Sequence, residues 1–376
     1  MAALEAAGGP DCARYVGGCV RNALMQVPVV DVDIATVLEP ARVKAALVAA
    51  GLKAVPTGEA HGTITAVAMG HGFEITTLRR DVSTDGRRAV VAFTTDWTED
   101  AARRDFRLNS LYAERSGQVF DPTGEGVDDA RHGRIVFVGD ARTRIREDFL
   151  RILRFFRFHA WYGRGAMDAE GLAACADLSE GLGLLSAERV SKEMLRLLEA
   201  ADPVPAVRAM QKTGVLARVL PGGMNVERFA AVAGRTGDPL VRLAALSQNE
   251  APTDLAKRWR LSNAQRDRLI AMTDDGPAPD REPRARATLY RLGAQAFRDR
   301  LALMVEDAAV RDRLAPLADW AIPVLPVGGA DVARLGLPAG PRTGLILKAF
   351  EADWIAADFP TDGHEDRLRR AAAATP

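Results

Sequence analysis

The feature that most constrains the fold of this chain is a short apolar run that ends in Gly17 and Gly18, followed by a helical pattern and a β-rich run over 29–36. That second run carries Asp31 and Asp33 in alternation with apolar residues. Because side chains at i and i+2 leave a strand on the same face, the two carboxylates are expected to point together. The pattern therefore predicts a strand, a glycine turn, a helix and a second strand.

The opposite face of that second strand is expected to be buried through Val30, Val32 and Ile34. Mg²⁺ prefers oxygen ligands, and two carboxylates near a glycine turn are suited to hold it against a triphosphate. Arg21 adds a planar fork that matches phosphate oxygens. Taken alone, however, such a pair of acids is more often a solvated strand face than a metal site.

A third carboxylate is expected from another strand-like run over 72–78, in which Glu74 alternates with apolar residues. If this strand lies beside the first, Glu74 joins Asp31 and Asp33. Carboxylates of this kind can hold two cations that stabilise the attacking and leaving oxygens of a nucleotidyl transfer. The alternative is an exposed strand glutamate with no part in the chemistry.

A second constellation consists of Arg103, Arg104 and Asp105, which we expect at the start of a helix, and Asn109. Residues at i and i+4 share a helix face, so Asp105 and Asn109 can hold ribose hydroxyls together. Arg104 is expected to reach phosphates. A salt bridge and helix cap is the more common reason for such a pattern.

A third constellation predicts how a base could be selected. Its apolar residues follow the i, i+3, i+4, i+7 pattern of one buried helix face: Phe149, Ile152, Leu153 and Phe156. Asp148, Arg151 and Arg154 lie on another face. A carboxylate accepts hydrogen bonds and a guanidinium donates them, which fits the edge that cytosine and adenine share and disfavours uracil and guanine. A charged helix face with ion pairs is the alternative.

These three constellations, in this order, resemble the motifs of class II tRNA nucleotidyltransferases, which comprise CCA-adding enzymes and bacterial poly(A) polymerases. The segments that carry the resemblance are Gly17–Arg21 with Asp31–Asp33, then Arg103–Asn109, then Glu147–Arg154. The similarity covers roughly 12–200 and favours the functional interpretation of each motif. One departure is Asn22, where the family usually has Asp, and we interpret that position as mainly structural.

The resemblance implies a role for each matching residue. Asp31, Asp33 and Glu74 would be catalytic, and the two aspartates would bind Mg²⁺. The nucleotide-binding residues would be Gly17, Gly18, Arg21, Arg104, Asp105, Asn109, Asp148, Arg151, Arg154 and Arg157. The implied fold class is α+β, with a polymerase-β-like nucleotidyltransferase head that contains a mixed sheet, followed by an all-α neck, body and tail.

The distribution of patterns along the chain agrees with this organisation. Strand-like runs lie in the first part, at 14–16, 29–36, 63–69 and 72–78, with helical patterns at 19–26 and 40–50, and from about residue 140 onward the pattern is helical with few strand signals. We predict a head over 1–140, a helical neck with the nucleotide-selecting helix over 141–202, and a body and tail over 203–376 that binds tRNA. The polar stretch 79–97, with turn chemistry at Asp85-Gly86, is expected to be a mobile loop.

Composition excludes several classes of protein. Among the 376 residues, basic and acidic side chains balance at 50 each, which argues against indiscriminate coating of nucleic acid but not against a local basic surface. No apolar run reaches the ~20 residues that span a bilayer, so no membrane is expected as a partner. The N-terminus lacks a secretory pattern and the three cysteines lack metal-ligand spacing, so we expect a cytoplasmic location. The oligomeric state is not indicated.

The function predicted from these observations is CCA addition to tRNA, with CTP, ATP and Mg²⁺. The alternatives are a poly(A) polymerase of the same family, which would not incorporate CTP, and a partial enzyme that adds only A. A non-catalytic RNA-binding protein belongs to a different class, and it would tolerate loss of the carboxylates that this chain retains.

Overall fold

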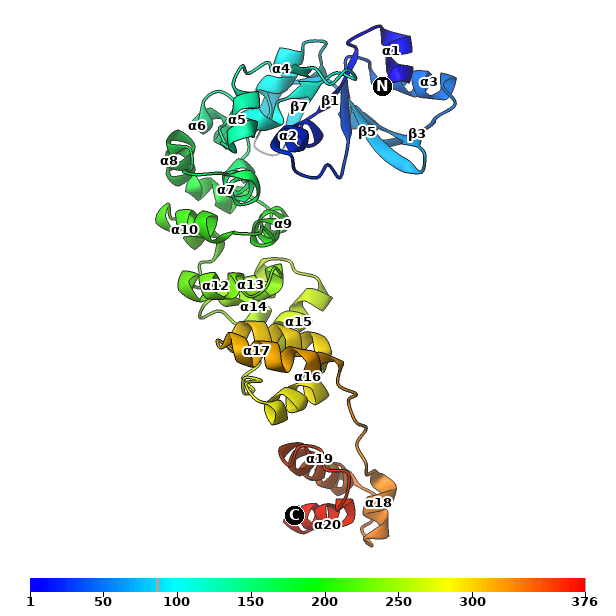
Figure 1. Cartoon of the computed structure of the whole chain (residues 1–376), viewed down its shortest axis with the longest axis vertical. Helices are drawn as coiled ribbons and strands as arrows, with labels where there is room; N and C mark the ends of the chain where they lie inside the picture. The colour runs from blue at the N-terminus through cyan, green and yellow to red at the C-terminus, as the bar shows by residue number, and fades with distance from the viewer. Residues whose placement is uncertain (86–87, 376) are drawn as a thin grey trace. The chain divides into compact units, whose positions relative to one another are not determined.

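The computed structural model describes residues 1–85 and 88–375 and divides the chain into two compact units, Met1–Val226 and Glu227–Pro376. The first unit begins with a mixed sheet and continues with helices (Figure 1). In the second unit, all secondary structure of the described residues is helical. The predicted α+β class, with a mixed sheet followed by helices, is confirmed.

Seven strands form the sheet of the head in the order β3-β4-β5-β2-β1-β8-β9. Their bounds are β1 Ala13–Val16, β2 Asp33–Thr36, β3 Lys53–Gly58, β4 Thr63–Ala68, β5 His71–Thr77, β8 Tyr112–Ala113 and β9 Val119–Phe120. Among the paired strands of the described residues, only β2 and β5 run parallel, and their register places Asp33 opposite Glu74. The prediction that the strand of Glu74 lies beside that of Asp33 is therefore confirmed.

The strand predicted over 29–36 is shorter than expected, because β2 begins only at Asp33. Its neighbour β1 pairs with it as far as Tyr15 opposite Ile34, and the chain then leaves the sheet at the glycine turn. In the part of the chain that the structure describes, the residues before Asp33 therefore have no strand beside them on the β1 side. The prediction that Val30 is buried is wrong, since its side chain is 85% exposed. Asp31 lies in the segment before the strand.

The two faces of the sheet are covered by different helices, because successive side chains of a strand alternate. Helices α1 (Ala2–Gly8) and α3 (Pro40–Ala49) cover the face that carries Ile34 and Ile75. The other face carries Ala35, which packs in a cluster with Ala101 of helix α4 (Trp97–Ala102). Asp33 points to this second face, since it lies two residues before Ala35.

The stretch 79–97 was predicted to be a loop, but it is not a continuous one. It contains β6 (Arg79–Asp85) and β7 (Arg88–Phe93), which pair antiparallel as a separate sheet, and the first residue of α4. The sequence of β7, which contains the apolar run Ala89-Val-Val-Ala-Phe93, was a strand signal that the interpretation of the whole stretch as polar overlooked. The turn at Gly86 lies outside the described residues, so the expected mobility stays a prediction.

Helices build the remainder of the first unit, and α7 packs against α9 and α10 (Figure 1). The bounds are α2 Gly18–Met25, α5 Gly126–His132, α6 Ala141–Glu147, α7 Leu150–Tyr162, α8 Ala169–Asp177, α9 Ala187–Leu198, α10 Val204–Lys212 and α11 Val215–Val219. The predicted helices at 19–26 and 40–50 correspond to α2 and α3. The apolar face predicted for α7 is confirmed at Ile152, Leu153 and Phe156, whereas Phe149 is only half-buried.

The second unit has its own hydrophobic clusters, which explains why it is compact by itself. Its helices are α13 Pro239–Leu246, α14 Pro252–Arg258, α15 Asn263–Thr273, α16 Glu282–Met304, α17 Ala308–Leu314, α18 Gly329–Arg334, α19 Pro341–Ala356 and α20 His364–Ala374, and α12 Val226–Ala233 lies at the division. Over the described residues, every helix is too short or too polar to cross a bilayer.

Candidate active site

A pocket of about 510 Å³ lies in the first unit, between the sheet face that carries Asp33 and the helices that follow the head. Its lining includes most of the residues that the sequence singled out: Gly17, Gly18, Arg21, Asp33, Arg104, Asp105, Asn109, Asp148, Arg151 and Arg154. Three segments that are far apart in the sequence therefore meet at one cavity. Asp31, Glu74 and Arg157 were also predicted but do not line it.

The glycine turn forms the start of α2. Gly17 adopts a φ of 70°, a backbone conformation that L side chains rarely adopt. A Cβ at Gly17 would lie 3.6 Å from Nη1 of Arg104, so the turn and this guanidinium border the same space. Backbone N–H groups at a helix start and a nearby arginine together suit phosphate oxygens.

Arg21 borders the pocket, although its side chain is mostly buried. Its guanidinium donates to Oδ1 of Asn109 and, at 2.9 Å, to Oδ1 of Asn22, and it lies 4.0 Å above the ring of Tyr162. Burial lowers the pKa of Arg21. Asn22 also donates to the Pro28 carbonyl at 2.8 Å, so it links Arg21 to the segment before β2. These contacts agree with a structural role for Asn22.

The prediction that a helix starts at Arg103, Arg104 and Asp105 is wrong. These residues follow a helix. The N-terminus of α4 is capped by Asp96, whose carboxylate accepts from the Thr98 N–H at 2.7 Å, and the helix ends at Ala102. Both arginines turn back to Asp100, at 2.7 and 2.8 Å.

Asp100 is the centre of a buried network that sequence reasoning missed. It is 1% exposed and also accepts from the Tyr112 hydroxyl at 2.8 Å and from the Arg79 N–H at 3.1 Å. Burial alone would raise the pKa of Asp100, but the charges of Arg104 and Arg103 hold it well below its usual range. The network fixes Arg104 beside the glycine turn.

Asp105 and Asn109 lie together, as predicted, although a 3₁₀ turn rather than an α-helix connects them. The Asn109 amide donates to Oδ1 of Asp105 at 3.1 Å, and Nε of Arg154 donates to Oδ2 at 2.8 Å. Burial opposes the ionisation of Asp105, but the Arg154 charge and these hydrogen bonds lower its pKa. The constellation is thus an ordered polar group on the pocket wall.

The acids on the sheet have a different environment. Burial raises the pKa of Asp33, and the negative charges of Glu74 and Asp31 raise it further, against the opposing charge of Arg104. In the described part of the chain, none of these three carboxylates forms an ion pair. Across the same residues, no three His, Cys, Asp or Glu side chains are grouped so that they could hold a metal ion by themselves. Two carboxylates suffice when substrate phosphates and water complete the shell of Mg²⁺.

The prediction that Asp148 and Arg151 share one helix is wrong. Asp148 lies between α6 and α7 in an extended conformation, and Arg151 lies on α7. Its Oδ1 accepts from the Leu150 N–H at 3.1 Å, close to the start of α7. Arg151 donates to a carboxylate oxygen of Glu147 and, at 3.1 Å, to the carbonyl of Arg103. Both side chains line the pocket, but each is already held by neighbours.

Helix α9 supplies two residues that the sequence analysis did not identify. Arg189 donates to Oδ2 of Asp148 at 2.7 Å and lines the pocket, and Glu193 accepts from Arg157 at 2.5 Å. Arg157 therefore lies behind the wall and supports it. The i, i+4 spacing of Arg189 and Glu193 was visible in the sequence, but nothing local indicated their distant partners.

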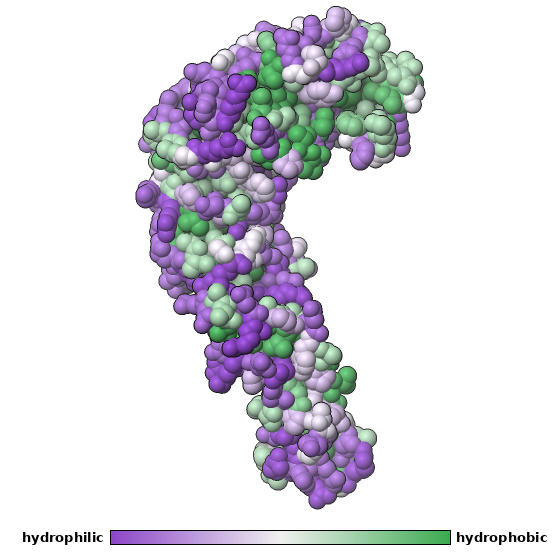
Figure 2. All heavy atoms as spheres, viewed as in Figure 1, coloured by the Kyte–Doolittle hydropathy of each residue, from purple (hydrophilic) through white to green (hydrophobic). Residues whose placement is uncertain are grey.

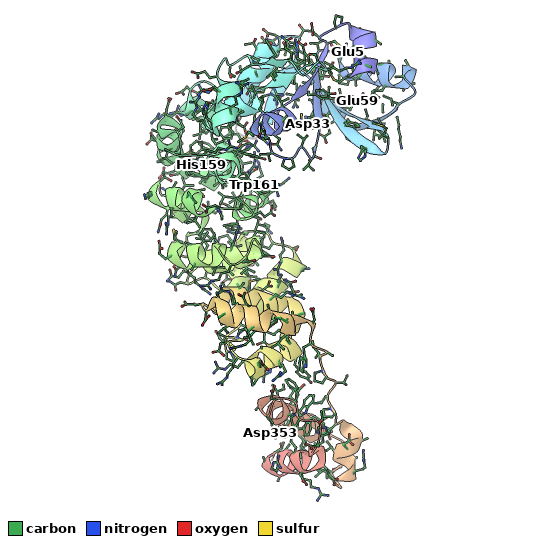
Figure 3. All side chains as sticks on the ribbon, in the orientation of Figure 1. Glu5, Asp33, Glu59, His159, Trp161 and Asp353 are labelled. Carbon is green, nitrogen blue, oxygen red and sulfur yellow. The ribbon has the colours of Figure 1, made fainter. Side chains whose placement is uncertain are left out.

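Figure 3 labels Asp33 on the sheet of the head, and His159 and Trp161 near the C-terminal end of α7. The aromatic part of α7 continues the pocket wall, since Phe158 lines the cavity beside Arg154. On the other side, Figure 2 shows hydrophobic residues gathered on the head where α2 and the segment after it lie. That segment includes the exposed Val29 and Val30.

Known proteins are similar to this chain in sequence and in fold. The family model described as "Poly A polymerase head domain" matches residues 13–136, and the one described as "Probable RNA and SrmB- binding site of polymerase A" matches residues 166–225. The mitochondrial CCA tRNA nucleotidyltransferase 1 of Mus musculus is 35% identical over 94% of this chain and 85% of its own length. The chain belongs to the CCA tRNA nucleotidyltransferase family.

Solved structures of CCA-adding enzymes have the same fold. The Bacillus stearothermophilus enzyme in complex with CTP matches with a TM-score of 0.78 and 27% identity, over 96% of this chain and 93% of that one. The Thermotoga maritima enzyme complexed with tRNA matches in fold, with a TM-score of 0.66 and 17% identity, over 96% and 91%. The pocket described above is thus the candidate active site of a CCA tRNA nucleotidyltransferase.

Proposed function

We propose that this chain builds or repairs the 3′-CCA end of tRNA from CTP and ATP, without a nucleic-acid template. The observation that carries the proposal is the convergence of the glycine turn, the Asp105 group and Asp148 on one pocket. In the reaction, the 3′-hydroxyl oxygen of the tRNA attacks the α-phosphorus of the nucleotide and pyrophosphate leaves. The relatives named CCA tRNA nucleotidyltransferase and CCA-adding enzyme support the same activity.

Asp33 and Glu74 on the sheet, with Asp31 just before β2, fit a divalent cation, because Asp33 is partly buried opposite Glu74 and close to the charge of Asp31. Asp31 and Asp33 would hold Mg²⁺, with Glu74 as the third acid. When bound, the metal would stabilise the charge on the attacking and leaving oxygens. The glycine turn, Arg21 and Arg104 would orient the triphosphate.

The helical side of the pocket would recognise the nucleoside. Asp105 and Asn109 would bind the ribose, since they form one ordered group that Arg154 supports. Asp148 would accept from the exocyclic amine of cytosine or adenine, and Arg151 would donate to the ring nitrogen. A site built for one hydrogen-bonding pattern rejects the reverse pattern because buried polar groups would then remain unpaired.

We further propose that the helical body and tail over 203–376 bind the tRNA, and that the enzyme works in the cytoplasm. Cys12, Cys19 and Cys175 are buried free thiols, which suits a reducing compartment. Fractionation of cells with an antibody against the protein would test the location.

The test of the activity is to incubate the purified protein with tRNA that ends at the discriminator base, with Mg²⁺ and with CTP, ATP or both. We expect two additions with CTP alone and three with both nucleotides. A run of A residues from ATP alone would identify a poly(A) polymerase, and action only on tRNA that already ends in CC would identify an A-adding enzyme. No incorporation on either tRNA would exclude an enzymatic function of this kind.

A further inference from the structure

The side chain of Arg189 lies beside the candidate base-selecting carboxylate at the pocket and binds it. It extends from the first turn of α9 and its Nη2 lies 2.7 Å from Oδ2 of Asp148. The side chains of Arg189 and Asp148 are 33% and 29% exposed, and both border the pocket. The contact therefore joins two separate elements directly at the cavity.

Two donors fix the carboxylate of Asp148 from different elements. The Leu150 N–H donates to Oδ1 at 3.1 Å, and Arg189 donates to Oδ2 at 2.7 Å. A carboxylate has two oxygens with about four acceptor sites, so each oxygen keeps the capacity to accept another hydrogen bond. With only one donor, the group could rotate about its Cβ–Cγ bond.

The element that carries Arg189 is itself firmly placed. The apolar residues of α9 that are fully buried include Met194, Leu197 and Leu198. One turn after Arg189, Glu193 binds Arg157 at 2.5 Å and Arg154 at 3.6 Å. Residues at i and i+4 lie on one helix face, so α9 presents both groups towards the same pocket wall.

We propose that Arg189 is a specificity-determining positioning residue, which holds Asp148 so that one carboxylate oxygen faces the exocyclic amine of cytosine or adenine. The inference rests on the proposed function of Asp148. Hydrogen-bond recognition depends on groups whose orientation is locked by a supporting residue. Without Arg189, Asp148 remains an acceptor but loses its fixed direction, and discrimination against UTP and GTP falls.

The experiment compares Arg189→Met with Arg142→Met, in single-turnover incorporation of each of the four nucleotides on the same tRNA. Arg142 is a matched control because it forms an ion pair with Asp177 at 2.6 Å, is 38% exposed and lies outside the pocket lining. We expect Arg189→Met to lower the preference for CTP over UTP about tenfold, as weakened alignment of one hydrogen bond implies. Arg142→Met should leave that preference unchanged. Arg189→Lys, which keeps one donor, should fall between wild type and Arg189→Met.

A double-mutant cycle separates positioning from direct contact with the base. In an Asp148→Ala background, Arg189→Met should cause no further loss of discrimination. A further loss there would show that Arg189 acts by another route and would overturn the proposal. Relaxed discrimination in Asp148→Ala but not in Arg189→Met would also overturn it, while the proposed role of Asp148 would stand. Full discrimination in Asp148→Ala would instead reject the proposed base-selecting site.

Thermal melting of each variant shows whether a loss of discrimination is due to a loss of folding. If the melting temperature of Arg189→Met lies far below that of Arg142→Met, then Arg189→Lys replaces Arg189→Met in the double-mutant cycle. Discrimination equal to wild type in a folded Arg189→Lys, together with relaxed discrimination in Asp148→Ala, would overturn the inference. A change in the nucleotide preference, rather than in the overall rate, is the signature that a merely structural role would not produce.

Discussion

The two sides of the candidate active site differ in how their carboxylates are partnered. On the sheet side, Asp33 and Glu74 lie opposite one another in the parallel pair β2–β5, and neither forms an ion pair within the described part of the chain. On the helical side, Asp105 and Asp148 each bind an arginine, at 2.8 and 2.7 Å. Asp33, Asp105 and Asp148 line the same pocket of the first unit, yet the charges around them differ, because Asp33 has acidic neighbours and the other two bind arginines.

The difference indicates which side of the site binds metal and triphosphate and which side recognises the nucleoside. Like charges that are close together and partly buried disfavour ionisation unless a cation joins them, which suits binding of metal and triphosphate. Carboxylates that arginines hold in place have a fixed direction and spare acceptor sites, which suits recognition of ribose and base. Changes on the sheet side should therefore alter the rate for every nucleotide, whereas changes on the helical side should alter the choice among nucleotides.

The largest effect is expected from Asp33→Ala. Loss of a metal ligand should lower incorporation of both CTP and ATP by at least ~10³, because stabilisation of the transferring phosphate is lost. The affinity for tRNA, measured by gel shift or fluorescence, should be nearly unchanged. Glu59→Ala is the matched control, since Glu59 is an exposed head carboxylate bound to Lys44 at 3.0 Å, and it should retain activity (Figure 3). Near-normal turnover of Asp33→Ala would remove this residue from the active site.

Asp100→Ala should have the next largest effect, and on stability. Removing one partner of a buried ion pair leaves an uncompensated charge, which costs about 3–5 kcal/mol in the free energy of unfolding. Asp177→Ala, which breaks an exposed pair with Arg142, should cost at most about 1 kcal/mol. Urea titration measures both. Equal values would mean that the Asp100 network contributes no more than a surface contact.

The same residue predicts a dependence on pH. The folded-state pKa of Asp100 lies below its unfolded value of about 3.9, so its contribution to stability is present at neutral pH and is lost as the pH falls below about 4. Wild type should therefore lose more stability between pH 6 and pH 3 than Asp100→Asn does. Parallel curves for the two proteins would contradict the assignment of the acid-sensitive group.

A smaller and more selective effect is expected from Asp148→Ala on the helical side. The discrimination of CTP and ATP against UTP and GTP should fall by ~1–3 kcal/mol, since the base amine loses its acceptor and a competing carbonyl loses its repulsion. Single-turnover rates for all four nucleotides provide the measurement. Glu199→Ala, in an exposed pair with Arg196, is the control. One common factor for all four rates would make Asp148 structural.

The smallest effect is expected from shortening the β6–β7 hairpin around Asp85. The base of the hairpin is anchored to the sheet side, because the Arg79 N–H donates to Asp100 at 3.1 Å, and the anchor would remain. If the tip moves as the site changes between bases, CTP addition should persist while the final ATP step slows about tenfold. Equal loss of both steps would show that the hairpin has no selective role.

Local patterns predicted those parts of the site in which neighbours in sequence remain neighbours in space. The glycine turn before α2 and the strand positions of Asp33 and Glu74 followed from turn chemistry and alternation, whereas the pairing of the two strands depends on residues far apart in the sequence. The boundary of β2 was wrong because it depends on where β1 leaves the sheet, which is a property of another segment. Asp148 was placed on α7 because its i+3 spacing to Arg151 cannot reveal a break between two helices.

The sequence by itself determined the α+β order of the chain and the chemical groups available to the site, because strand alternation, helix periodicity and turn residues act over a few positions. Only the tertiary structure decided which acid meets which arginine. Asp100 forms ion pairs with the arginines that follow its helix, and Asp148 accepts a hydrogen bond from Arg189, which lies 41 positions further along the chain. Such pairs form when packed helices bring charges together in a partly buried space, where each charge needs a partner and sequence distance no longer matters.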